Sequence, residues 1–278
     1  MSPVLIFSGI AGYFLMLLFV GYITGRKADS DGYFLGNKQS IWWLVALGML
    51  SDSMSGVSFI SVPGAVGVAQ LHYFQIVMGY VLGYLVIAYV LLPLYYRHQL
   101  TSIYGYLEHR FNPVSQKTGA IVFVISRLLG SAGRLFLAAV ILQEFLFEPW
   151  GISFPISVAV IIGLILLYTI KGGIKTLVFT DAIQSVFLIG GLVIALVSML
   201  NSDLLSHLSF MQVIQSAGRT EIIETNILSS SFFGKHLIGG MFICIAMTGL
   251  DQNMMQKNLS IRTLKEAQWN MLSTSAIV

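Results

Sequence analysis

Apolar stretches long enough to span a membrane recur along the chain, separated by short polar segments. A helix needs about 20 apolar residues to cross the hydrocarbon core of a bilayer. The pattern predicts seven such helices, and an eighth apolar run begins near Thr263. The seven predicted spans cover residues 4–24, 41–66, 72–96, 117–145, 153–171, 176–199 and 236–256. The predicted fold class is therefore all-α, a polytopic helix bundle in a lipid bilayer.

The composition supports this prediction and sets an orientation. Hydrophobic residues make up 56% of the 278 positions and charged residues only 10%, which excludes an ordinary soluble domain. Of the 15 Lys and Arg residues, 11 fall in the connections of one side. The positive-inside rule makes that side cytoplasmic and places the N-terminus outside the cell (inner) membrane. Since the net charge of +3 arises at these interfaces, no nucleic-acid partner is predicted.

The second span contains a polar run where it should be most apolar. Residues 51–58 read Ser-Asp-Ser-Met-Ser-Gly-Val-Ser. An Asp at the centre of a bilayer costs about 2.5–3.5 kcal/mol, so Asp52 is a candidate functional residue. Ser and Gly also make it easy for a helix to open, and open backbone at this depth must line a cavity or protein. We therefore predict an interruption around residues 51–56 that faces a small ion or solute.

Two further acids lie inside predicted spans, and each has two interpretations. Asp181 is surrounded by hydroxyl and amide side chains, which suit a hard cation, but it is also close to Lys171 and Lys175 for an ion pair. Asp251 lies six residues before Lys257. A structural hydrogen bond or ion pair and a substrate role are equally consistent with its position.

Two arginines occur in the fourth span. Arg127 and Arg134 are seven residues apart, so they project from nearly the same face of a helix, and that face must look into the bundle. They are expected to pair with Asp52, Asp181 or Glu144, or to meet an anionic substrate. Pairing is favoured for Arg127.

Glycines and the outer loop complete the organisation. Gly79 and Gly83 form a small-residue face typical of tight helix contact, and Gly239, Gly240 and Gly249 allow the seventh span to pack closely or to break. Residues 200–234 predict a loop with short amphipathic helices on the outer face.

Nothing in the sequence predicts an enzyme. There is no Gly-rich phosphate loop of the Walker type, the histidines lack metal-ligand spacing, and no catalytic triad can be nominated. Cys244 is the only cysteine, which excludes an intrachain disulfide. The sequence predicts no oligomeric state.

Three blocks resemble the sodium/solute symporter family, whose members couple Na+ entry to solute uptake. They are Tyr33–Gly36 with Trp42-Trp43, Lys171–Lys175 with Thr180–Gln184, and Asp251–Lys257 with Leu264–Gln268. The resemblance implies the LeuT-type fold, an inverted repeat of five helices with broken helices. Residues 1–40 then form an extra helix and cytoplasmic loop, 41–199 the first repeat, 200–234 the extracellular loop and 235–278 the start of the second repeat. On this reading the chain is the N-terminal part of a larger transporter.

The resemblance also implies a function and a set of site residues. The function is Na+-coupled import of a small organic solute by alternating access, with Na+ as the coupling ion. Backbone carbonyls at Ser51 and Met54 would contribute to the main Na+ site, and Asp181 to a second sodium or its exit path. Substrate contacts map to Ser58, Phe74, Cys244, Met247 and Thr248.

These positions differ from those of sugar-transporting relatives, since polar sugar-binding side chains and an aromatic gate are absent. A smaller solute, such as an amino acid or a carboxylate, suits them and Arg134 better. Two alternatives remain open. One is a proton-coupled carrier in which Asp52 or Asp181 titrates, and the other is a transporter-like sensor that binds a solute without moving it.

Overall fold

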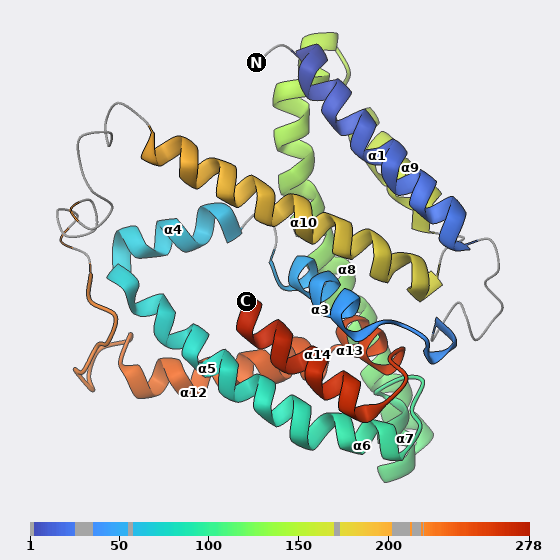
Figure 1. The fold of residues 1–278 in the computed structure, drawn as a ribbon, viewed down its shortest axis with the longest axis vertical. Coiled ribbons are helices and arrows are strands. Elements are labelled where there is room, and N and C mark those ends of the chain that lie inside the picture. The colour runs from blue at the N-terminus through green and yellow to red at the C-terminus, as the bar shows by residue number, and fades with distance from the viewer. Residues whose placement is uncertain are drawn as a thin grey trace.

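The protein is described here from a computed structural model that covers residues 3–25, 36–54, 58–169, 173–201, 212, 218 and 220–278. In these residues it is a bundle of helices, and Figure 1 shows their arrangement. The α-helices are α1 (Pro3–Gly25), α3 (Trp42–Ser53), α4 (Ser58–Ala69), α5 (Tyr73–Val86), α6 (Leu92–Arg97), α7 (Gly105–Arg110), α8 (Pro113–Leu142), α9 (Phe154–Thr169), α10 (Gly173–Leu200), α12 (Phe233–Cys244), α13 (Gln252–Leu259) and α14 (Leu264–Ile277). Short π-helical segments are η3 (Ile87–Leu91), η4 (Gln143–Phe147) and η6 (Ile245–Gly249), and 3-10 turns are η1 (Gly36–Lys38), η2 (Gln70–His72) and η5 (Glu148–Trp150).

Four helical stretches of the described residues are long and apolar enough to cross a membrane. They are Phe7–Thr24, Ser61–Arg97, Pro113–Trp150 and Thr176–Leu200. A fifth is obtained if Phe233–Gly249 and Gln252–Leu259, which meet at a bend of 65°, form one span. The seven predicted spans exceed this number because 153–171 folds as the shorter helix α9 and 41–66 is divided into α3 and α4.

The second span is interrupted where its sequence predicts. Helix α3 ends at Ser53, Met54 is extended (φ −101°, ψ 138°), and α4 starts at Ser58. The last helical hydrogen bond runs from the Met54 amide to the Leu50 carbonyl over 2.8 Å. Residues 55–57 lie outside the described part of the chain, so the path of the connection is not given. The predicted helix opening is confirmed at its α3 end.

The seventh span is interrupted as well. The π-helical turn η6 ends at Gly249, and Asp251 is extended (φ −96°, ψ 122°) before α13 begins. The Asp251 carboxylate accepts a hydrogen bond from the Met254 amide over 3.0 Å and so caps α13. The Tyr95 hydroxyl donates to the Gly249 carbonyl over 2.9 Å. Side chains therefore satisfy backbone groups that the break removes from the helix ladder.

Glycines bring α5 and α12 into close contact along their length. A Cβ atom on Gly79 would lie 2.3 Å from the Leu237 carbonyl oxygen, and one on Gly240 would lie 2.3 Å from the Ile76 carbonyl oxygen. The backbones thus touch directly, as small residues permit between membrane helices. The predicted role of this small-residue face in helix contact is confirmed.

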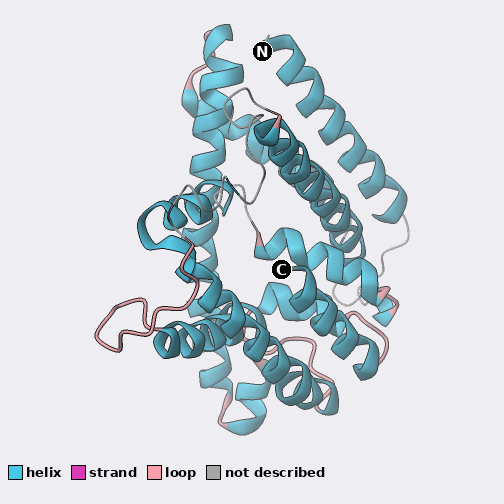
Figure 2. Cartoon of the chain, turned by 60° about the vertical axis from the view of Figure 1, so that its left-hand side comes forward, coloured by secondary structure: helices cyan, strands magenta, loops and turns pink. Residues whose placement is uncertain are grey.

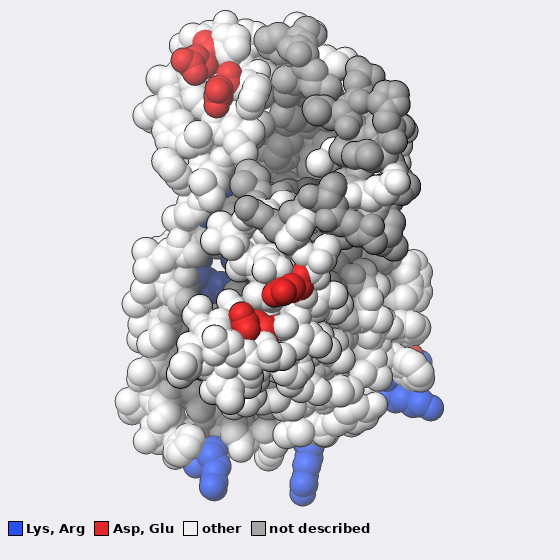
Figure 3. All heavy atoms as spheres, turned by 90° about the vertical axis from the view of Figure 1, so that its left-hand side faces the viewer, with Lys and Arg blue, Asp and Glu red and all other residues white. Residues whose placement is uncertain are grey.

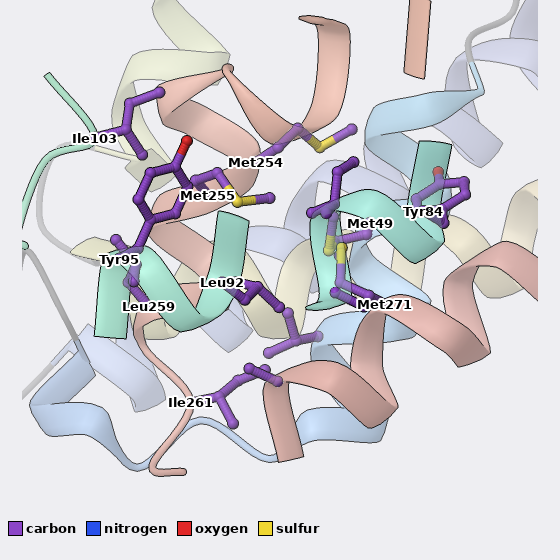
Figure 4. Packing of buried hydrophobic residues seen from close by; sticks show 14 of the residues in the cluster. Met49, Tyr84, Leu92, Tyr95, Ile103, Met254, Met255, Leu259, Ile261 and Met271 are labelled. Atoms are coloured by element: carbon purple, nitrogen blue, oxygen red, sulfur yellow. The ribbon is translucent and has the colours of Figure 1, made fainter. Parts of the chain in front are cut away.

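The main core joins both broken spans to their neighbours. Figure 4 shows Met49 of α3, Tyr84 of α5, Met254 of α13 and Met271 of α14 within one buried cluster. Flexible Met side chains fill irregular gaps between helices that cross at different angles. The broken ends of α3 and α13 are therefore held by packing on one side.

The start of α14 and the outer loop have their own hydrogen bonds. The Thr263 hydroxyl accepts from the Glu266 amide over 3.3 Å and so caps α14, and the same hydroxyl donates to the Glu266 carboxylate over 2.9 Å. The predicted helices in 200–234 fall mostly outside the described residues. The described stretch 220–232 is not helical, and its Glu224 amide donates to the Gln75 side chain over 3.3 Å.

Candidate functional site

One large cavity lies between the two broken spans and α8. It has a volume of about 1360 Å³. Its walls come from the end of α3, from α4, α5, α8, α12 and η6, and from the start of α13. Figure 3 shows basic atoms within a recess at mid-height of one face, while other Lys and Arg atoms gather at one end of the molecule. The interior of a mostly apolar bundle is thus hollow at the place where its helices are interrupted.

The end of α3 borders this cavity. Ser51 and Met54 both line it. The Ser51 amide donates a hydrogen bond to the Ser185 hydroxyl of α10 over 3.1 Å. The C-terminal end of a helix carries partial negative charge, and its last carbonyls have no partner within the helix. These groups are chemically suited to a monovalent hard cation.

Asp181 is placed differently from the other candidates. It is buried on α10 and does not border the cavity. Its carboxylate binds the ammonium of Lys257 on α13, and the same ammonium binds the carboxylate of Asp52 on α3. The ion pair foreseen for Asp181 thus exists with Lys257 as its partner, while Lys171 and the side chain of Lys175 lie outside the described residues. The proposed metal role of Asp181 stays a prediction.

The two arginines of α8 differ in their polar partners. Both line the cavity, so the face predicted to look into the bundle does so. Arg127 pairs with Asp251, which is 3% exposed, and this partner was not among those predicted for Arg127. The Arg134 Nε donates only a long bond of 3.4 Å to the Gly130 carbonyl. Within the described residues Arg134 has no carboxylate at ion-pair distance.

The substrate candidates named from the sequence come together in space. All of them line this cavity, although they come from five different elements. They are Ser58 of α4, Phe74 of α5, Arg134 of α8, Cys244 of α12, and Met247 and Thr248 of η6. Their placement is compatible with a shared ligand, and their binding roles remain predictions.

Several cavity residues were not foreseen. Tyr80 and Tyr84 of α5, and Phe123 of α8, add an aromatic wall, and Gln252 of α13 adds an amide. Lys257 was counted only as a charge of a cytoplasmic connection, yet its side chain is 2% exposed. The acids within the spans were the available signal, because a buried carboxylate needs a cation nearby.

The sequence matches known families and proteins over most of its length. A model of the sodium:solute symporter family matches residues 33–277. Sodium-coupled monocarboxylate transporter 2 of Mus musculus is 27% identical over 264 residues, which are 91% of this chain and 41% of the mouse protein. The sodium/iodide cotransporter of Homo sapiens is 26% identical over 260 residues, 92% of this chain and 39% of the human protein. The chain thus spans about two fifths of these relatives.

Sialic acid symporters also match, in sequence and in structure. The sodium/sialic acid symporter SiaT of Proteus mirabilis is 24% identical over 286 residues, 96% of this chain and 54% of that protein. A solved structure of a Na+-coupled sialic acid symporter in a substrate-bound outward-open state superposes with a TM-score of 0.83 at 22% identity. The match covers 98% of this chain and 56% of the chain in that structure. At this identity the likeness establishes the fold, which is the LeuT-type bundle predicted from the sequence.

Proposed function

The chain belongs to the sodium:solute symporter family, and from this premise we propose that it serves Na+-coupled import of a small organic solute by alternating access. One observation carries the proposal. Both interrupted spans, α3–α4 and α12–α13, open onto a single cavity that also holds the candidate substrate residues. Interrupted helices near the membrane centre supply the backbone groups with which transporters of this kind bind ions and solutes.

We place the coupling Na+ at the carbonyls of Ser51 and Met54. The end of α3 faces the cavity, its helix dipole favours a cation, and oxygen ligands suit Na+. In this proposal the Asp181 carboxylate binds a second Na+ or lies on the path by which Na+ leaves. We also keep the division of the chain predicted from the sequence, with residues 41–199 as the first repeat and the N-terminus outside the cell membrane.

We assign the solute to the small carboxylates, with amino acids included because they carry the same group. Arg134 offers a guanidinium to the cavity, and a planar guanidinium binds a carboxylate through two parallel hydrogen bonds. Tyr80 and Tyr84 provide an apolar and aromatic wall for the rest of a small molecule. Two of the relatives are named for monocarboxylates and for sialic acid, which agrees with an acidic solute.

Uptake by the full-length protein in proteoliposomes tests the proposal. We expect accumulation of at least one labelled carboxylate or amino acid when an inward Na+ gradient is present, and loss of accumulation when choline replaces Na+. Arg134→Gln should raise the half-saturating carboxylate concentration at least tenfold. The matched control is Lys235→Gln, whose exposed ammonium binds only loop carbonyls.

Two other results would replace the proposal. Uptake that follows pH and persists in potassium buffer would identify a proton-coupled carrier. Saturable solute binding without any uptake would identify a sensor of the same fold.

A further inference from the structure

Lys257 is the largest side chain that the described part of the protein buries completely. It belongs to α13, and its ammonium binds the carboxylates of Asp52 on α3 and Asp181 on α10. An ammonium can donate in three directions, so one Lys is able to hold two acids at once. Three helices that are distant in sequence are therefore joined by one positive charge.

We propose that Lys257 is a tethered cation that holds α13 closed against the cavity, and that a mobile cation takes its place between Asp52 and Asp181 when α13 moves away. The first part stands on the contacts alone. The second part rests on the proposed Na+ coupling. Lys257 is a positioning residue in this scheme, because it acts on the ion site through the helix that carries it.

Helix α13 is placed to act as a cover. Four of its residues line the cavity: Gln252, Asn253, Met254 and Gln256. It is eight residues long and is set at 65° to the preceding half of its span, so it forms a separate rigid element behind a break. Figure 1 shows α13 beside α14, and Figure 2 shows the C-terminus, at the end of α14, in the middle of the bundle. Movement of α13 would change one wall of the cavity without unfolding α12.

Neutral hydrogen bonds of Tyr96, Gln252 and Asn258 fasten α13 to α6, to the segment before α7 and to α14, whereas ionic contacts fasten it to α3, α8 and α10. At its start, Asp251 pairs with Arg127 of α8. Past its end, the Ser260 hydroxyl donates to the Ser40 hydroxyl over 2.7 Å. Between these points the Lys257 ammonium is the ionic link to α3 and α10. An ionic contact of this kind is released by a competing ion, which an apolar contact is not.

The charges favour exchange with a monovalent cation. With both carboxylates ionised, the group of Lys257, Asp52 and Asp181 has a formal charge of −1. Withdrawal of the ammonium would leave two like charges close together in a site of low dielectric constant, which is strongly unfavourable. A Na+ that enters as Lys257 leaves keeps the formal charge unchanged. Asp52 gives such an ion access, since it borders the cavity and its side chain is 19% exposed.

The experiment uses the full-length protein in detergent, with thermal unfolding measured in choline chloride and over a Na+ titration. We compare wild type with Lys257→Gln, Lys257→Arg and the control Lys235→Gln. Lys257→Gln should unfold at a lower temperature than wild type in choline, and its half-maximal stabilisation should need at least tenfold less Na+, because no ammonium competes. Lys257→Arg and Lys235→Gln should respond to Na+ as wild type does.

A second measurement needs no variant. Hydrogen exchange of wild-type peptides covering residues 252–259 should be faster in saturating Na+ than in choline, since Na+ displaces the tethered ammonium. An unchanged exchange rate, or an unchanged Na+ response in Lys257→Gln, would overturn the exchange of cations.

The experiments distinguish a failure of the proposed role of Lys257 in holding α13 from a failure of the proposed Na+ coupling. In one outcome no form responds to Na+, Lys257→Gln is destabilised, and adding Asp52→Asn restores its unfolding temperature. Lys257 then holds α13 as proposed, and the Na+ coupling is wrong. If Lys257→Gln is as stable as wild type in choline, Lys257 does not hold α13 and its proposed role is wrong.

Discussion

The contact between α5 and α12 gives the sharpest prediction of stability, because neighbouring glycines of α12 differ completely in their surroundings. A Cβ atom on Gly240 would lie 2.3 Å from the Ile76 carbonyl oxygen and 3.0 Å from its carbon. A Cβ atom on Gly239 would meet nothing within 4 Å. Gly240→Ala and Gly239→Ala therefore form a matched pair with the same chemical change on the same helix.

The size of the effect follows from these distances. Ordinary contact begins near 3.4 Å, so α5 and α12 must separate by about 1 Å to admit the new methyl group. Overpacking of this kind costs about 1–3 kcal/mol, and an Ala in a helix interior regains about 0.5–1 kcal/mol over Gly. The obstacle is backbone on both sides, which cannot rotate away as a side chain can. We expect Gly240→Ala to be destabilised by roughly 1–2 kcal/mol and Gly239→Ala to be unchanged or slightly stabilised.

The assay is reversible unfolding of the full-length protein in mixed micelles, followed by tryptophan fluorescence. Gly79→Ala, which faces the Leu237 carbonyl oxygen at 2.3 Å, should match Gly240→Ala. Equal stabilities of the Gly239 and Gly240 variants would show that the two helices do not pack through their backbones.

Three further substitutions test other contacts by the same unfolding assay. Asn112→Ala should cost about 1 kcal/mol, because the Asn112 side chain accepts from the Ser115 amide over 2.8 Å and caps α8. Arg127→Gln should cost about 1–3 kcal/mol by leaving the buried Asp251 carboxylate without its cation, and Asp251→Asn in the same chain should recover part of the loss. Ser185→Ala should cost about 1 kcal/mol, since its hydroxyl joins α10 to the Ser51 amide of α3.

The bundle and its interruptions are predictable from sequence because both are local in origin. Apolar runs of fixed length define helices in lipid, and Ser, Gly and Asp within such a run mark the place where the helix opens. The break at Met54 follows from residues beside it in the chain. The division of 41–66 into two helices, and the bend at Asp251, involve the same residue types.

The ion pairs are not predictable in the same way, because each joins residues far apart in sequence. Lys257 is 205 positions from Asp52 and 76 from Asp181. Its sequence neighbourhood, at the end of a span and close to other basic residues, is typical of an interfacial charge. Only the fold of α13 back towards α3 and α10 buries it. Arg127 likewise finds Asp251 through the packing of α8 against the second break, which no periodicity encodes.

The distribution of charge around the cavity links the two proposals. Six charged side chains lie in or beside it: Asp52, Asp181, Asp251, Arg127, Arg134 and Lys257. Their formal charges sum to zero, yet they are not paired one to one. Arg127 neutralises Asp251, one ammonium serves two acids, and Arg134 has no carboxylate partner in the described residues. The cavity therefore carries an excess negative charge near the end of α3 and an excess positive charge on α8. A cation added at the Ser51 and Met54 carbonyls and an organic anion at Arg134 would together cancel both, so binding of either favours binding of the other, whereas a neutral solute would leave Arg134 without a counter-charge.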